Sequence, residues 1–386
     1  MTSMIDPAMP LGATSLPVPN DDAPPPVPRS GLRAANPEDR FTQIGSWAGG
    51  FALSWVITQR LLPAGGLTWF LIVGFVMGVV ITGITAAMTG SAIEVRDRVA
   101  TAFVTAGTLI VGFALASTLI YVFKQGYKPL LHWNFFFEDS AGVGPRDPFT
   151  KGGILHAIVG SLIQVGIATV ITIPLGIGTA VFMTEIGGKF AKVVRTVVEA
   201  MTALPSIVAG LFIYTVMIIG LGFPRSGICA AFALGVMMLP IIARAADVVL
   251  RVVPGGLREA SLALGASRWK TVWHVVLPTA RPGLATALIL GIARGIGETS
   301  PVLLTSGAAS FLVTNPTDGV MNSLPLYIYS TVRSGEPIAI ERAFGAASVL
   351  LILVLVLFVI ARALARQRTT KPSRVSGLVQ RMRDSQ

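Results

Sequence analysis

Apolar runs long enough to cross a membrane recur through the 386-residue chain, and they constrain its fold more than any other feature. An α-helix needs about 20 apolar residues to cross the hydrocarbon core of a bilayer. Lipid offers the backbone no hydrogen-bond partners, so a spanning segment must be a helix or a strand of a closed barrel. The residue alternation of barrel strands is absent from these runs. The sequence therefore predicts an all-α, polytopic membrane helical bundle.

Composition and charge exclude other classes of protein. Hydrophobic residues make up 53% of the chain and charged residues only 13%, whereas soluble domains carry roughly 25% charged residues. The net charge of +11 does not indicate nucleic-acid binding, because the basic residues lie beside apolar segments, as in the cytoplasmic loops of membrane proteins. We expect lipid around the chain. The three histidines lack metal-ligand spacing, and Cys229 has no partner, so we expect neither a metal site nor a disulfide.

Eight apolar segments are the expected spans. The first is the weakest, since it contains Gly45, Ser46 and Ser54, and a short link with Pro63 joins it to the second as in a helical hairpin. Six spans would remain if this hairpin were an accessory element. The segments lie at residues 44–59, 67–89, 99–123, 154–183, 200–222, 227–246, 284–307 and 344–363.

The expected domain organisation follows from these segments and from two polar ends. Nine of the 25 prolines lie in the first 39 residues, a composition typical of disorder. We therefore expect a disordered, Pro-rich tail at 1–43, an accessory transmembrane hairpin at 44–92, a transmembrane domain at 93–365 and a basic tail at 366–386. With both termini cytoplasmic, 20 of the 30 Lys and Arg residues lie on the cytoplasmic side, eight lie on the opposite side, and Arg244 and Arg294 lie within spans. This bias is the one that the positive-inside rule predicts.

The loop at 251–281, between the sixth and seventh spans, has the pattern of a helix–turn–helix. A short helix is expected at 257–264, and Gly265 supplies the backbone freedom for a sharp break. Ser267 is placed to cap a second helix, and we expect Pro278 and Pro282 to stop that helix before the next span. The loop is too hydrophobic to be merely solvated.

This loop resembles the coupling loop of the permeases of bacterial ABC importers. Those loops have Glu-Ala-Ala, a Gly six residues after the Glu, and a distal Leu-Pro; here Glu259 and Ala260 precede Ser261, and Gly265 and Leu277-Pro278 follow. The one departure is Ser261 for the second Ala. The resemblance implies a six-helix permease core whose loop inserts into a groove on an ATPase dimer.

The chain itself has no sequence for ATP binding. A phosphate-binding Walker loop needs Gly-x4-Gly-Lys-Ser/Thr. The nearest string, Gly188-Lys189-Phe190, has Met183 where the first Gly belongs. We therefore expect no catalytic residue, no enzyme activity and no cofactor in this chain, with ATP and Mg²⁺ bound by the partner ATPase.

A second group of polar residues lies within the seventh span. Glu298 follows Arg294 by four positions, and Thr299 and Ser300 come directly after Glu298. A charge at the bilayer centre costs roughly 2.5–3.5 kcal/mol, and a carboxylate one helical turn away neutralises it. The pair is either a buried ion pair that fixes helix packing or part of a substrate path. We favour the path, in which Arg294 offers bidentate hydrogen bonds to an oxyanion.

The residues around this pair resemble phosphate-importer permeases of the PstA type. The family signature Ala-Arg-x-x-Gly-Glu-Thr-Ala/Ser-Pro-Leu-Leu is matched from Ala293 to Pro301, with Leu303-Leu304 following after Val302. The segments 204–212 and 324–329 are also similar to PstA-type permeases. The sister PstC type usually has Met and Ala after Glu-Thr, where this chain has Ser300-Pro301. The resemblance covers about residues 95–365. It implies inorganic phosphate as substrate, a bacterial cytoplasmic (inner) membrane, a PstC-type second permease, an ATPase dimer and an external phosphate-binding protein.

Three alternatives stay open. The first is an ABC permease for another oxyanion, such as sulfate or molybdate. The second is a secondary transporter that needs no ATPase, against which the loop at 257–278 argues, since a self-sufficient carrier has no use for a docking element. The third is a membrane sensor subunit that assembles without transport.

Overall fold

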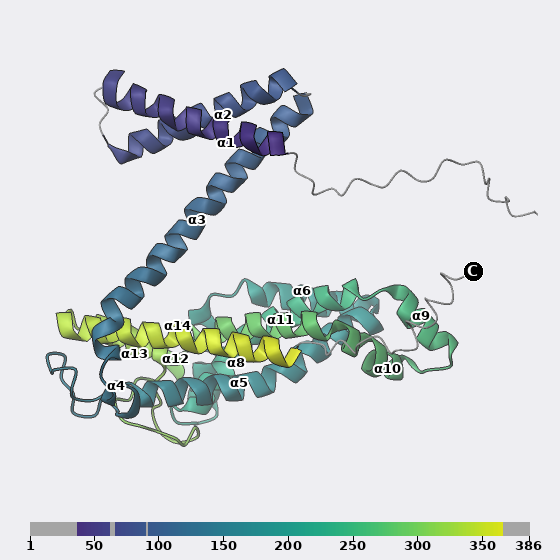
Figure 1. Ribbon diagram of the computed structural model, residues 1–386. Coiled ribbons are helices and arrows are strands. Elements are labelled where there is room, and N and C mark those ends of the chain that lie inside the picture. The colour runs from purple at the N-terminus through teal and green to yellow at the C-terminus, as the bar shows by residue number, and fades with distance from the viewer. Residues whose placement is uncertain (1–36, 62–65, 90–91, 366–386) are drawn as a thin grey trace, which may run out of the picture. The chain divides into compact units, whose positions relative to one another are not determined.

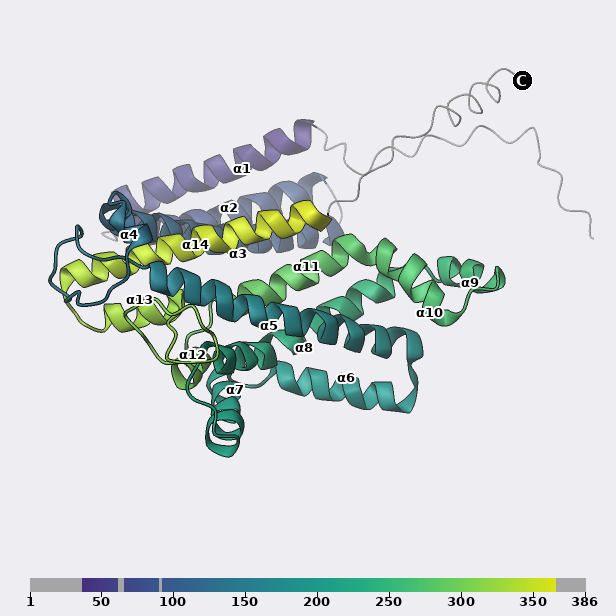
Figure 2. The ribbon, with the colours of Figure 1, turned by 90° about the horizontal axis from the view of Figure 1, so that it is seen from below.

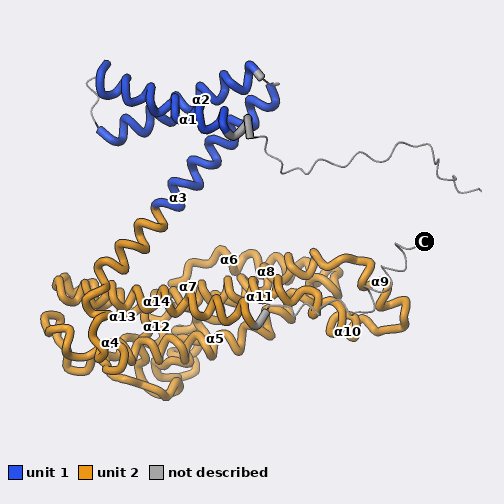
Figure 3. The backbone as a smooth tube through the Cα atoms, viewed as in Figure 1, with its two compact units in different colours: residues 1–113 blue, residues 114–386 orange. Residues whose placement is uncertain are grey.

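The computed structural model describes residues 37–61, 66–89 and 92–365, and within these ranges every regular element is a helix. The chain divides into two compact units, residues 1–113 and 114–386 (Figure 3). The expected basic tail at 366–386 and most of the expected Pro-rich tail lie outside the described residues. The division between the units falls inside α3 (Ala92–Leu130), whereas the domain boundary expected from the sequence lies near the start of that helix.

The first unit contains the expected hairpin. Its arms are α1 (Pro37–Val56), extended by the π-helical segment η1 (Ile57–Leu61), and α2 (Leu67–Thr89). The polar residues that made the first arm look weak are on the face that meets α2: Ser46 and Ser54 are buried, and the Ser54 hydroxyl donates to the Phe70 carbonyl at 2.7 Å. Small and hydroxyl-bearing residues at such a contact are typical of helices packed within a membrane.

The second unit is built on long helices that lie side by side (Figures 1 and 2). The long elements are α5 (Leu155–Val181), α8 (Gly227–Val252), α11 (Leu277–Ile296) and α14 (Pro337–Ala365). Its shorter elements are α4 (Asn134–Phe137), η2 (Phe182–Ile186), α6 (Gly188–Thr202), α7 (Ser206–Ile213), η3 (Tyr214–Gly220), α9 (Gly255–Ala263), α10 (Arg268–Thr271), η4 (Val272–Val276), α12 (Ser300–Thr305) and α13 (Leu324–Val332). Both views place α9 and α10 at one end of the unit and α4, α12 and α13 at the other.

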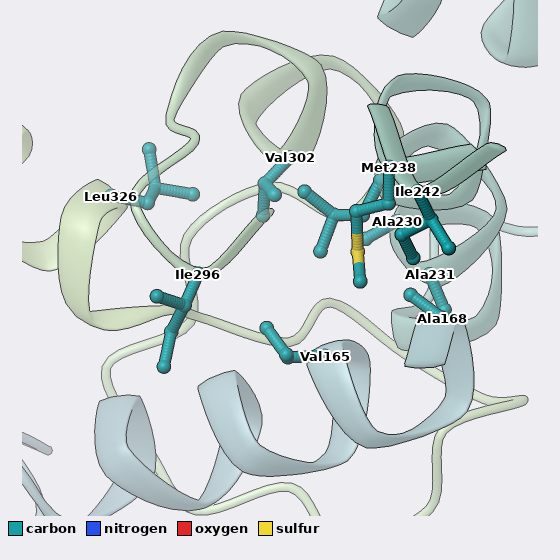
Figure 4. Packing of buried hydrophobic residues seen from close by; sticks show 10 residues of the cluster. Val165, Ala168, Ala230, Ala231, Met238, Ile242, Ile296, Val302 and Leu326 are labelled. Carbon is teal, nitrogen blue, oxygen red and sulfur yellow. The ribbon is translucent and has the colours of Figure 1, made fainter. Parts of the chain in front are cut away.

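The core of this unit surrounds α8. Small residues on α8 let its neighbours approach, and Met238 and Ile242 fill the space between them (Figure 4). Val165 and Ala168 of α5 pack on one side, and Val302 of α12 packs from the end of the bundle. Gln164 on α5 is fully buried and donates to the carbonyls of Met321 and Asn322 at 3.2 and 3.4 Å. It therefore packs the interior of the unit.

Two of the expected spans are broken. The fifth bends by 106° between α6 and α7–η3, where Pro205 takes an extended conformation (ψ 140°) and disfavours helix in the residue before it. The seventh stops at Ile296, and α12 begins as a separate helix with Pro301 in its first turn. Among the described helices, six are long and apolar enough to cross a membrane, or seven if the bent pair counts as one span. The helix α1 is not among them, so eight spans was an overestimate.

Candidate functional site

The docking loop, residues 251–281, has the local structure expected from its sequence. The helix α9 ends in a turn in which Gly265 has φ +82°, the left-handed region that favours glycine. The Gly265 amide donates to the Leu262 carbonyl at 2.9 Å and the Ala266 amide to the Ser261 carbonyl at 3.2 Å, the hydrogen-bond pattern of a Schellman cap. The Ser267 hydroxyl then caps α10 by accepting from the Lys270 amide at 3.4 Å.

The two prolines do not stop the second helix of the loop, and that expectation was wrong. Pro278 lies in the first turn of α11 and Pro282 inside it, and the helical path runs from Arg268 to Ile296. The π-helical segment η4 precedes Pro278 and spaces the turn more widely at the point where the proline lacks its amide donor. The docking loop is therefore continuous with the span that follows it.

Arg258 fastens α9 to two other helices. Its Nη1 and Nη2 donate to the carbonyls of Val253 and Leu250 at 2.7 and 2.8 Å, at the end of α8. Its Nη2 also lies 3.0 Å from the carboxylate of Glu185 in η2, and both side chains are mostly buried. The guanidinium thus satisfies carbonyls that the helix end leaves without partners. Arg258 therefore links α9 to the end of α8 and to η2, which follows α5.

Ser261, the one departure from the family motif, also has a structural partner. Its hydroxyl lies 2.9 Å from the hydroxyl of Thr271, so it links α9 to α10 across the turn. An alanine at this position would lack that link. The substitution is therefore more than an exchange of one small residue for another.

The docking loop has an unpacked surface. No residue of α9 is buried, and Glu259, Ala260 and Gly265 are exposed. Leu264 is 88% exposed and Trp269 65% exposed, whereas Leu277 and Pro278 are partly covered. Exposed apolar side chains gathered on one loop mark an interaction surface.

Arg294 and Glu298 form the expected ion pair, in a different setting from the one expected. Arg294 Nη2 lies 2.9 Å from Glu298 Oε1, but Arg294 is in the last turn of α11 and Glu298 lies beyond the end of that helix. The Arg294 side chain is 56% exposed, whereas that of Glu298 is 9% exposed. The carboxylate is therefore anchored in the bundle, and the guanidinium is held at a face that the chain itself leaves open. A charge on that face needs water or another subunit rather than lipid.

The break after α11 brings two signature segments together. Thr299 precedes α12 without capping it, Ser300 opens that helix, and both are partly exposed beside Glu298. A Cβ at Gly210 in α7 would lie 2.6 Å from Pro301 Cα. The segments 204–212 and 294–304, which the sequence singled out separately, therefore pack against each other. The docking loop and this pair lie at the two ends of one helical path.

Sequence reasoning missed the ionic contacts around the docking loop. Besides Arg258, Asp247 near the end of α8 accepts from Arg195 and Arg251, each at 3.2 Å. Asp247 is 8% exposed, and an acidic residue in an apolar helix was a usable signal. Arg195 lies more than 50 positions from its partner Asp247, and so does Glu185 from its partner Arg258. A pattern of neighbouring residues does not reveal pairs at that separation.

The described residues form a helical bundle, and one helical path in it joins an exposed loop at one end to a charged pair at the other. Residues 172–370 match the family described as binding-protein-dependent transport system inner membrane component, and the chain belongs to this family. It is a multi-pass membrane protein.

Relatives and a solved structure agree with this placement. A phosphate transport system permease protein PstA from Mycobacterium leprae (strain TN) is 39% identical over 262 residues, 68% of this chain and 86% of the relative. PstA from Pasteurella multocida (strain Pm70) is 34% identical over 243 residues, 62% of this chain and 84% of the relative. The crystal structure of a bacterial alginate ABC transporter in complex with an alginate pentasaccharide-bound periplasmic protein contains a similar chain. It has a TM-score of 0.50 and 17% identity, and the match covers 72% of this chain and 96% of that one. At this identity the likeness shows the fold alone.

Proposed function

We propose that the chain is one of two permease subunits of an ATP-driven importer of inorganic phosphate. The observation that carries the proposal is the position of Arg294: a guanidinium held by a buried carboxylate at an open face, at the far end of a helical path that begins in the docking loop. The similarity to PstA permeases supports phosphate as the cargo. A PstC-type permease would cover the open face and complete the path.

The docking loop would receive the energy of ATP hydrolysis. An ATPase dimer would bind ATP and Mg²⁺. It would contact the exposed surface around Glu259, Ala260 and Gly265. The partly covered Leu277 and Pro278 would support this surface from within the permease. Movement of this surface would pass through Arg258 to α8 and along the helix to Arg294. The docking loop and both termini would then be cytoplasmic, in accord with the bias of Lys and Arg residues. A phosphate-binding protein would deliver phosphate at the opposite face.

Arg294 would meet phosphate in transit. Its planar guanidinium matches two oxygens of an oxyanion, and Thr299 and Ser300 offer hydroxyls beside it. Glu298 would both orient Arg294 and compete with the anion for it, so that phosphate is not retained. In this arrangement the carboxylate limits residence time, because a path that binds tightly does not conduct.

The test is phosphate uptake into proteoliposomes by an assembled complex whose permease carries Arg294→Gln. We expect uptake to be lost while the ATPase still co-purifies with the permease. The matched control is Arg333→Gln, which removes an exposed arginine whose side chain contacts Tyr329; it should transport normally. Normal uptake by Arg294→Gln would return the pair to a packing role.

Two further measurements separate this proposal from its rivals. Uptake that proceeds without ATP, in a chain that binds no ATPase, would indicate a secondary transporter. Stronger competition by sulfate or molybdate than by unlabelled phosphate would indicate a permease for another oxyanion.

A further inference from the structure

A cavity of about 280 Å³ with a mixed polar and apolar lining lies in the second unit. Figures 1 and 2 place two of its lining elements, α13 and the start of α14, at the end away from the docking loop. We call it the distal cavity. Its walls come from four separate parts of the chain: the loop at 140–145, the start of α5, the segment 308–322, and α13 with the start of α14. The pair Arg294–Glu298 is not among its lining residues, so the cavity is distinct from the site described above.

The wall of the distal cavity contains a buried arginine. Arg342 lines it and is 5% exposed, and its Nη2 donates to the backbone carbonyls of Asp147, Pro148 and Lys151 at 2.7–3.0 Å. Its guanidinium also lies over the Phe149 ring, 5.9 Å from the ring centroid. Among the described residues, no carboxylate forms an ion pair with Arg342. Buried charges in proteins are otherwise almost always paired.

The acidic residues nearby have partners other than Arg342. Glu336 is paired with Arg146 and Glu341 with Lys128, each at 2.7 Å. Both oxygens of Asp139 accept backbone amides, from Ala141 and Leu312. The lining residues include one arginine and neither aspartate nor glutamate. The cavity is therefore suited to an anion.

His156 on α5 provides a second, independent signal. It lines the distal cavity, is 2% exposed, and both its ring nitrogens are buried without a hydrogen-bond partner among the described residues. Its ring meets Tyr327 edge-on at 5.4 Å. The great majority of buried polar side-chain atoms are hydrogen-bonded. A neutral imidazole presents one donor and one acceptor, so a partner that serves both must offer an acceptor and a donor.

The walls are held in place by buried hydrogen bonds. The Ser306 hydroxyl donates to the Met321 carbonyl at 2.6 Å, and the Leu324 amide donates to the Ser161 hydroxyl at 2.7 Å. The Asn322 side chain donates to the Ala309 carbonyl at 2.7 Å. These bonds fix the segment 306–324 against α5, so the cavity is a built feature and its lining is preorganised.

We propose that the distal cavity binds a protonated tetrahedral oxyanion, with Arg342 facing its charge and His156 facing both an oxygen and a hydroxyl of the ligand. Hydrogen phosphate carries oxygens and a hydroxyl, whereas sulfate at neutral pH has no proton to donate. The site therefore discriminates by hydrogen bonding as well as by charge. It rests on the proposed function only for the identity of the oxyanion, and it would hold phosphate on the delivery side before the anion reaches Arg294.

A cysteine at Ser330, an exposed lining residue on α13, allows a direct test in the assembled complex. The native Cys229 is fully buried, so labelling by an anionic thiol reagent reports Ser330→Cys. We expect inorganic phosphate to slow this labelling at least five-fold and sulfate at equal ionic strength to slow it much less. A control cysteine in the segment 308–322, Thr314→Cys, is exposed and outside the lining, and its labelling should not change.

Two variants complete the test. His156→Phe keeps the ring contact with Tyr327 but removes the nitrogens, and Ala308→Leu fills the cavity from an exposed position; each should abolish protection by phosphate. Equal labelling rates with and without phosphate would overturn the proposal, and so would equal protection by sulfate. Labelling does not require transport. If phosphate does not protect Ser330→Cys in a complex that imports phosphate, the cavity site is refuted and the proposed function is not. If phosphate still protects Ser330→Cys in a complex that carries Arg294→Gln and does not transport, the cavity site is supported.

Discussion

Replacement of Gly265 tests whether the turn of the docking loop is needed for coupling. The residue has φ +82°, and a Cβ placed there meets no atom within 4 Å. A side chain at this position therefore costs only the backbone conformation, about 1–2 kcal/mol for an ordinary L-residue. That cost corresponds to roughly a 5- to 30-fold loss of the docking-competent turn. Valine, branched at Cβ, should lie at the upper end, and asparagine, which tolerates the left-handed region, near wild type.

The measurement is the apparent affinity of the ATPase for the permease in proteoliposomes, together with transport-coupled ATP hydrolysis. We expect both to fall in the order Asn, Ala, Val at position 265. Gly256→Ala is the matched control, because Gly256 lies within α9 and its Cβ would also meet no atom within 4 Å. It should be neutral or slightly stabilising. If Gly265→Val and Gly265→Asn couple equally well, the left-handed turn is not required for docking and the reasoning fails.

Two other changes probe the contacts that hold the docking loop. Arg258→Met should lower the stability of the loop by about 3 kcal/mol. The variant leaves the mostly buried Glu185 without its cation and two backbone carbonyls without a donor. Arg258→Lys, which keeps the positive charge, should be more stable than Arg258→Met but less stable than wild type. Limited proteolysis of the loop in the purified complex measures the effect, and unchanged protection would contradict it. Ser261→Ala should cost about 0.5–1.5 kcal/mol through the lost bond to Thr271. In a double-mutant cycle scored by thermal unfolding, adding Thr271→Val should then cost little more; strictly additive effects would show that the hydroxyls do not interact.

The docking loop was predictable because its structure is local. The left-handed turn at Gly265 and the cap at Ser267 each depend on residues within five positions of one another. The ion pair of Arg294 with Glu298 was predictable for the same reason, since one helical turn separates them. The hairpin in the first unit followed from two apolar runs joined by a short link.

The features that sequence reasoning got wrong depend on how the chain compensates a proline. At Pro278 the helix continues, because the π-helical turn before it accommodates the missing donor. At Pro205 and Pro301 the chain breaks and starts a new helix. The same residue type thus gives opposite results. Arg258 was missed for a related reason, since Glu185 lies 73 positions away.

The close packing of α8 against its neighbours makes a further prediction about how movement reaches Arg294. Ile242 on α8 fits between two glycines: a Cβ at Gly176 of α5 would lie 2.7 Å from Ile242 Cγ2, and a Cβ at Gly291 of α11 would overlap Ile242 Cγ1. The three helices therefore approach closely at this level, with the Ile242 side chain packed against both glycines. Since Arg258 also ties the docking loop to α8, we infer that α8 and α11 move as one body.

Gly291→Ala should separate α11 from α8. Overpacking of a filled core costs about 1–3 kcal/mol, and we expect lower thermal stability together with ATP hydrolysis that no longer drives uptake. Ile242→Ala, which removes the overlapping atoms, should restore part of both in the double variant, with a coupling energy of at least 0.5 kcal/mol. Gly166→Ala on α5 is the control, since its Cβ would meet no atom. If Gly291→Ala loses stability but keeps coupling, α11 transmits movement through its own helix and not through contact with α8.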